Sequence, residues 1–175
     1  TATGGGLTTI DAGGIDRVLH VGAGGSLTVE GVGITGGNTS GSGGGIFNQG
    51  GTVRLIDTTL SDNTAATGGG ITNTGDLQID NSTISGNTGG GIQNLIGGTL
   101  QITRSTISNN TKTSAAGITN AGSASIDNTI VAGNIGTLQN TDVAGNFASA
   151  GFNVIGKASV SATGFVAADI VGSVS

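Results

Sequence analysis

One short motif occurs four times in this chain of 175 residues, and each copy places an isoleucine after a run of small residues. The copies are Gly-Gly-Gly-Ile-Phe-Asn (43–48), Gly-Gly-Gly-Ile-Thr-Asn (68–73), Gly-Gly-Gly-Ile-Gln-Asn (89–94) and Ala-Ala-Gly-Ile-Thr-Asn (115–120). Their isoleucines, Ile46, Ile71, Ile92 and Ile118, follow one another at intervals of 25, 21 and 26 residues. A repeat of this length is typical of one turn of a solenoid, which buries its apolar side against the next turn.

Two further apolar patterns accompany each copy. The first alternates apolar and polar residues, as Leu77-Gln-Ile79 does, and predicts a strand with one buried face. Its anchor residues form one expected core column: Val29, Leu55, Ile79, Ile102 and Ile126. A second column lies five residues further on: Ile34, Leu60, Ile84, Ile107 and Val131. No segment has a helical period. We therefore predict an all-β fold, a right-handed parallel β-helix of six to seven coils, with three short strands per coil of about 24 residues.

Asparagine recurs at two positions of the repeat. The motif itself ends in Asn48, Asn73, Asn94 and Asn120, and a second set follows the anchors by eight residues: Asn63, Asn87, Asn110 and Asn134. Asparagines stacked in successive coils can hydrogen-bond along the stack, so we predict two structural ladders. We expect the glycine runs to lie at tight corners where the backbone needs a positive φ.

Composition excludes several classes of function. The chain has five basic and ten acidic residues, so it lacks the positive surface that a nucleic-acid partner requires. The absence of cysteine excludes disulfides, Fe–S clusters and Cys-ligated zinc. No apolar run is long enough for a transmembrane helix, and we expect no signal peptide within these residues. We predict no nucleic-acid partner, no membrane span and no cofactor.

The order and spacing of these motifs resemble those of a known family of repeats. The Gly-Gly-Gly-Ile-x-Asn copies and Asn-Ser-Thr-Ile-Ser-Gly-Asn (81–87) resemble the parallel β-helix repeats of large bacterial surface proteins, including polymorphic outer-membrane protein repeats. The third motif residue is Gly where that family has Ala, and its Phe-x-x-Asn element is missing here. Segment 8–21 is similar to the opening coils of such domains, and 151–156 to their closing coils. The resemblance implies a bacterial, extracellular or cell-surface protein with an adhesive or structural role.

The regular repeats divide the chain into three parts. We interpret 1–175 as a single domain, with an opening coil at 1–25, regular repeats at 26–134 and less regular closing coils at 135–175. Phe147, Phe152 and Phe165 are expected to close the last coils. A solenoid exposes its core at both ends. We therefore expect either a fragment of a longer protein, capped by flanking domains, or a subunit that stacks end to end with its own copies.

Acidic residues recur just after the anchors. Glu30, Asp57 and Asp80 fall at one corner of successive coils, roughly 5–7 Å apart if the rungs are adjacent. This strip is a candidate for weak cation binding, which a Ca²⁺ titration tests. Together with Arg54 or Arg104 it also supports an alternative function, a carbohydrate-binding or polysaccharide-degrading β-helix. Apolar and amide residues interrupt the strip, and a solvated polar corner is the simpler interpretation.

Three other patterns have structural explanations. Segment 31–36 matches G-x-G-x-x-G, but no helix follows it, so the glycines are interpreted as a corner. His20, the single histidine, is expected on an early strand facing solvent. The triplets 59–61, 83–85 and 106–108 place Thr and Ser outward on successive rungs. Such an array also suits an ice-binding protein, the third hypothesis, which a thermal-hysteresis assay tests. The array is short, and the ordinary β-propensity of threonine explains it.

The function predicted from the sequence is that of a non-catalytic, extracellular structural or adhesive module, part of a surface stalk or filament. Its expected partners are copies of itself, flanking domains of the same protein, or surface glycans. We predict no catalytic residue, no bound cofactor and no dedicated metal ligand beyond the acidic strip.

Overall fold

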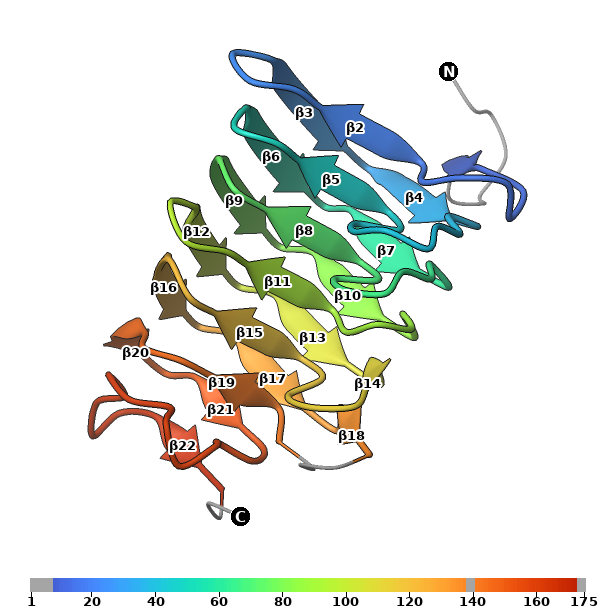
Figure 1. The fold of residues 1–175 in the computed structure, drawn as a ribbon. Helices are drawn as coiled ribbons and strands as arrows, with labels where there is room; N and C mark the ends of the chain where they lie inside the picture. Colours follow the sequence, from blue (N-terminus) through green and yellow to red (C-terminus); the bar gives the residue numbers. More distant parts are fainter. Residues whose placement is uncertain (1–7, 138–140, 173–175) are drawn as a thin grey trace.

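The predicted β-solenoid is confirmed in a computed structural model, which describes residues 8–137 and 141–172. The chain winds through about six turns of about 24 residues, and each regular turn contributes one strand to each of three parallel sheets (Figure 1). We name these the A, B and C sheets. A regular coil runs from the B sheet through a turn to the C sheet, around a corner to the A sheet, and back through a long loop.

The strands are short, and each pairs with the equivalent strand of the next coil. The A sheet contains β1 (Thr8–Asp11), β4 (Val32–Thr35), β7 (Thr59–Ser61), β10 (Thr83–Ser85), β13 (Thr106–Ser108), β17 (Ile130–Ala132), β21 (Val154–Ile155) and β22 (Ile170–Val171). The B sheet contains β2 (Leu19–Val21), β5 (Ile46–Asn48), β8 (Ile71–Asn73), β11 (Ile92–Asn94), β15 (Ile118–Asn120) and β19 (Val143–Ala144). The C sheet contains β3 (Ser26–Glu30), β6 (Thr52–Ile56), β9 (Asp76–Asp80), β12 (Thr99–Thr103), β16 (Ser123–Asp127) and β20 (Ala148–Gly151).

A fourth, two-stranded sheet lies on the long loops and was not predicted. It pairs β14 (Thr111–Lys112) with β18 (Ile135–Gly136). The sequence gives no alternating pattern at these positions, because each strand has only two residues.

Side-chain columns form because the pairing is in register. In the C sheet Leu55 pairs with Ile79, Ile79 with Ile102, and Ile102 with Ile126. All ten aliphatic residues of the two expected core columns are at most 7% exposed. The alternate residues of the C strands, Arg54, Gln78 and Gln101, are exposed, as a two-residue period requires. The apolar core therefore runs continuously along the solenoid axis.

The glycines of the repeated motif have two different roles. The first glycine of three copies has a positive φ, as expected: 67° at Gly43, 57° at Gly68 and 100° at Gly89. The glycine directly before each isoleucine has no positive φ; it lies against the next coil instead. A Cβ at Gly45, Gly70, Gly91 or Gly117 would stand 2.5–2.8 Å from a backbone oxygen of that coil. The prediction that every glycine of the run lies at a corner is therefore wrong for the glycine directly before the isoleucine.

The closing coils only partly follow the expected use of phenylalanine. Phe147 is 4% exposed and stacks on Phe165 with the ring centroids 5.8 Å apart, so these two rings close the core. Phe152 does not take part, because it is 71% exposed and occupies a left-handed turn with a φ of 58°. The register also shifts between β16 and β20, which marks the end of the regular repeat.

Candidate functional site

The acidic strip predicted from the sequence lies at the corner between the C and A sheets. Glu30 ends β3 and pairs in register with Ile56, which pairs in register with Asp80. Glu30 and Asp80 are therefore two rungs apart, about 10 Å at ordinary strand spacing. Asp57 lies one residue beyond this column, in a left-handed conformation with a φ of 50°. The three carboxylates are not brought together around one point.

Neighbouring side chains engage two of these carboxylates. Asn81 donates a hydrogen bond from its amide to Asp57, and the hydroxyl of Thr103 donates to Asp80 at 2.8 Å. Arg104 forms an ion pair with Asp80 at 2.5 Å. Within 8–137 and 141–172 no group of three or more His, Cys, Asp or Glu residues could hold a metal ion. Weak cation binding at this corner stays a prediction.

The threonine and serine array is present on the outer face of the A sheet. Thr59, Thr83 and Thr106 pair in register, and so do Ser61, Ser85 and Ser108. All six side chains are half-buried. The array ends at Ile130 and Ala132 of β17, and Gly33 of β4 precedes it on the other side.

The asparagines form two buried ladders along the axis. At the ends of the B strands, each amide nitrogen from Asn48 to Asn94 donates to the asparagine oxygen of the following coil at 2.8 Å. In the long loops, the file from Asn63 to Asn134 is joined by bonds of 2.8–3.0 Å. Each amide also donates to backbone carbonyls, so the ladders hold neighbouring coils at fixed separation.

A third ladder, built from hydroxyls, follows the C–A corner and was missed in the sequence. The backbone NH of Thr58 donates to Ser82 Oγ at 3.1 Å, and the NH of Ser82 donates to Ser105 Oγ at 3.1 Å. The file continues through Thr129 to Asn153. The available signal was a Ser or Thr three residues after each anchor from Leu55 to Ile126.

Two of the three ladders end on an aspartate at the C-terminal side. Asp142 Oδ1 accepts both the NH and the amide of Asn134, and its Oδ2 accepts the NH of Lys157 at 2.8 Å. Asp169 Oδ1 accepts the NH and the amide of Asn153, and its Oδ2 accepts the NH of Val166. An ionised carboxylate only accepts hydrogen bonds, so it suits a place where every neighbouring group is a donor.

The side-chain carboxylate of Asp169, at the end of the hydroxyl ladder, predicts that the last coil opens in acid. Partial burial raises the pKa of Asp169, but hydrogen bonds from Ser149, Val166 and Asn153 outweigh it and hold the pKa below its ordinary value. The contribution of ionised Asp169 to the stability of the last coil is therefore complete above the pKa of the group in the unfolded chain, about 3.9. It is lost as pH falls through the lower pKa of the folded state. Hydrogen exchange at the NH of Ile170, which bonds to Asn153 O, should accelerate in that range. The Asp169→Asn variant should show fast exchange at neutral pH and little further change with acid; an unchanged pH profile would contradict this assignment.

Three side chains cover the outer face of the first B strands. The exposed His20 stacks on Phe47 with centroids 5.2 Å apart, and the Arg17 guanidinium lies 5.2 Å from the Phe47 ring centroid. Arg17 also donates to the backbone oxygen of Ser42 at 2.9 Å. Stacking on Phe47 gives His20 a structural role. Its exposure to solvent agrees with the position predicted from the sequence.

A notch interrupts the row of long loops at the third regular coil. The B-sheet isoleucine follows the ladder asparagine by eight residues in the neighbouring coils, Asn63 to Ile71 and Asn110 to Ile118. From Asn87 to Ile92 the interval is only five. The shorter loop leaves a cavity of about 300 Å³ lined by Ala65, Ala66, Thr88, Gly89, Thr111, Lys112, Thr113 and Thr137. The interval of 21 residues between motif copies was the sequence signal for this cavity.

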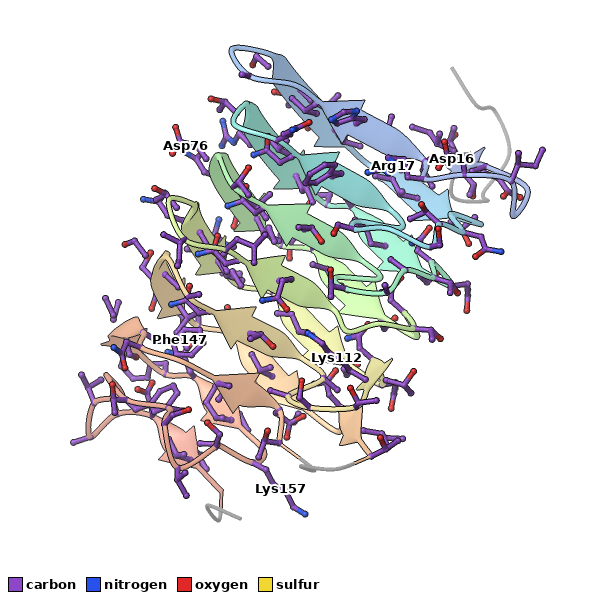
Figure 2. The ribbon with its side chains drawn as sticks, viewed as in Figure 1. Asp16, Arg17, Asp76, Lys112, Phe147 and Lys157 are labelled. Atoms are coloured by element: carbon purple, nitrogen blue, oxygen red, sulfur yellow. The ribbon has the colours of Figure 1, made fainter. Side chains whose placement is uncertain are left out.

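Lys112 is the charged residue of this notch (Figure 2). Its stem passes over the third coil, because a Cβ at Gly90 would meet Lys112 Cδ at 3.2 Å. Its ammonium donates to Gln93 Oε1 of β11 at 2.6 Å, and burial lowers the pKa of Lys112 below its ordinary value. Among the described residues no carboxylate pairs with Lys112.

Comparison of the chain with protein-family models, curated proteins and solved structures found no significant match in any of the three. Over the described ranges, no helix is long and apolar enough to cross a membrane.

Proposed function

We propose that this chain is a non-catalytic structural module of an extracellular or cell-surface assembly, acting as a rigid section of a stalk or filament. The observation that carries the proposal is the set of three buried hydrogen-bond ladders parallel to the axis. They join successive coils through side chains that are at most 7% exposed, in addition to the backbone bonds of the sheets. Such cross-linking resists both bending of the stack and separation of its coils.

The last strand of the A sheet supports self-association end to end. Among the described strands, β22 pairs with β21 alone. β22 exposes Ile170 at 67% and Val171 at 38%. An open strand edge with apolar side chains is a template for pairing with another chain. Because the two ends of the solenoid differ, the contact is head to tail and propagates into a filament.

Other functions have narrower support. The regular Thr and Ser files on the A sheet favour ice binding, but within the described part of the chain three coils carry both residues. The enzyme hypothesis relies on Glu30, Asp57 and Asp80, and the last two already bond to Asn81, Thr103 and Arg104.

Filament formation is tested by light scattering and electron microscopy over a range of protein concentrations. We expect the unmodified chain to form rods that lengthen with concentration. The double variant Ile170→Lys, Val171→Lys should weaken association by about tenfold or more, because it places charges on the apolar edge.

Ile96 supplies a matched control for this experiment. It is 84% exposed on the turn between β11 and β12, at the side of the rod. Ile96→Lys should leave rod length unchanged. A chain that stays monomeric at every concentration would contradict the filament role, and equal effects of both variants would contradict the end-to-end contact.

A further inference from the structure

The notch at the third coil has the features of a small ligand site. Its volume of about 300 Å³ lies at the lower end of the range of about 300–1,000 Å³ that is usual for small-molecule pockets. Two alanines and four threonines are among its lining residues, and the hydroxyl of Thr111 donates to that of Thr88 at 3.5 Å. Neighbouring coils with longer loops, at Ala65–Ala66 and Thr111–Thr113, form its two sides. The space thus suits one small molecule with both apolar and hydroxyl-bearing faces.

The charge of the notch selects the kind of ligand. The ammonium of Lys112 has three N–H donors, and a single protein acceptor, Gln93 Oε1, is found for it within the described chain. The remaining donors of this half-buried, cationic group match a carboxylate oxygen, which is an anionic acceptor.

We propose that the notch binds a sugar acid, with its carboxylate on Lys112, its hydroxyls on the threonines, and its C–H face on Ala65 and Ala66. This site goes beyond the proposed structural role, because it requires neither self-association nor stiffness. The same chemistry is offered by a free sugar acid and by a sugar-acid unit of a polysaccharide.

Amide NMR spectra of the whole chain, titrated with D-glucuronate, test the assignment. Saturable shifts are expected at Thr88, Thr111 and Lys112, with clearly weaker responses to D-glucose and to acetate at equal concentration. Glucose binding as well as glucuronate would overturn the role of the charge, and acetate binding as well would overturn the role of the hydroxyls. No saturable shift in the notch would overturn the site itself. A glucuronate-containing tetrasaccharide that binds more tightly than the monosaccharide assigns the site to a polymer, and the reverse assigns it to the free acid.

Variants separate the contribution of Lys112 from that of net charge. Lys112→Gln should weaken glucuronate binding about tenfold or more, since it removes a charged hydrogen bond. Lys157→Gln makes the same charge change at the C-terminal end of the rod, where Lys157 extends away from the body, and should leave binding unaltered (Figure 2). Equal losses in both variants would contradict a specific contact.

Two further measurements distinguish the loss of a ligand contact in Lys112→Gln from a loss of folded structure. Ala66 is exposed at the edge of the notch, so Ala66→Leu should block binding while unfolding stays unchanged. Binding should also fall as pH rises through the lowered pKa of Lys112, earlier than the value of about 10.4 for an ordinary lysine would require. Retained affinity in Ala66→Leu would contradict the location.

Discussion

Replacing Gly70 by alanine is expected to lower the free energy of unfolding by about 3 kcal/mol or more. The new Cβ would stand 2.5 Å from the carbonyl oxygen of Gly91 in the next coil and 3.0 Å from Ile84 Cγ2. The same oxygen accepts the NH of Ile71 at 2.8 Å, so the coils cannot separate to admit the methyl group without losing a sheet bond. Urea unfolding followed by circular dichroism measures the change.

Gly22 provides the control for this substitution. A Cβ at Gly22 has nothing within 4 Å, and its φ is not positive. Gly22→Ala should therefore change the stability by no more than about 0.5 kcal/mol. If Gly70→Ala were equally mild, close contact between coils would not be the reason for the glycine before each isoleucine.

Replacing Asn87 by alanine is expected to lower the free energy of unfolding by about 3–5 kcal/mol. Asn87 is fully buried in the long-loop ladder. Its amide donates to Asn110 Oδ1, Leu60 O and Ser85 O, and its oxygen accepts both the NH and the amide of Asn63. Alanine leaves these groups without their partner inside the protein, and each such group costs about 1–3 kcal/mol.

Gln101 is the matched control, since it carries an amide on the outer face of β12 and is exposed. Gln101→Ala should stay within about 0.5 kcal/mol of the unmodified chain in the same urea experiment. Similar losses for Asn87→Ala and Gln101→Ala would show that the ladder adds no more than an ordinary surface amide does.

The core columns and the ladder positions follow from the sequence because they depend on period alone. Ile79 and Ile102 recur at nearly constant intervals, and in-register stacking then places them over one another. The role of the glycine before each isoleucine depends instead on the distance to the next coil, which no spacing along one chain expresses. Gly70 and Gly43 therefore look alike in the sequence but serve different purposes in the fold.

The acidic strip failed as a cluster for a geometric reason. Counting from the anchors placed Asp57 and Asp80 at the same corner, yet their offsets differ by one residue. That residue moves Asp57 into the left-handed turn and brings Ile56 between Glu30 and Asp80. The notch was not predicted, because it depends on three neighbouring loops at once. The interval of 21 residues was visible, but a short loop becomes a cavity only when the loops on both sides of it are longer.

The unbroken register of the C sheet makes rod length adjustable. Leu55, Ile79, Ile102 and Ile126 occupy the same position in consecutive coils, so whole coils between β6 and β16 are nearly interchangeable units. Duplication or loss of one complete coil would rejoin equivalent columns and equivalent ladder rungs, leaving the lateral faces and both ends as they were. Insertion of a single residue within a strand would turn its buried side chains outward. A gene encoding such a chain can therefore change its reach in steps of about 4.8 Å, one strand spacing, through copy number alone.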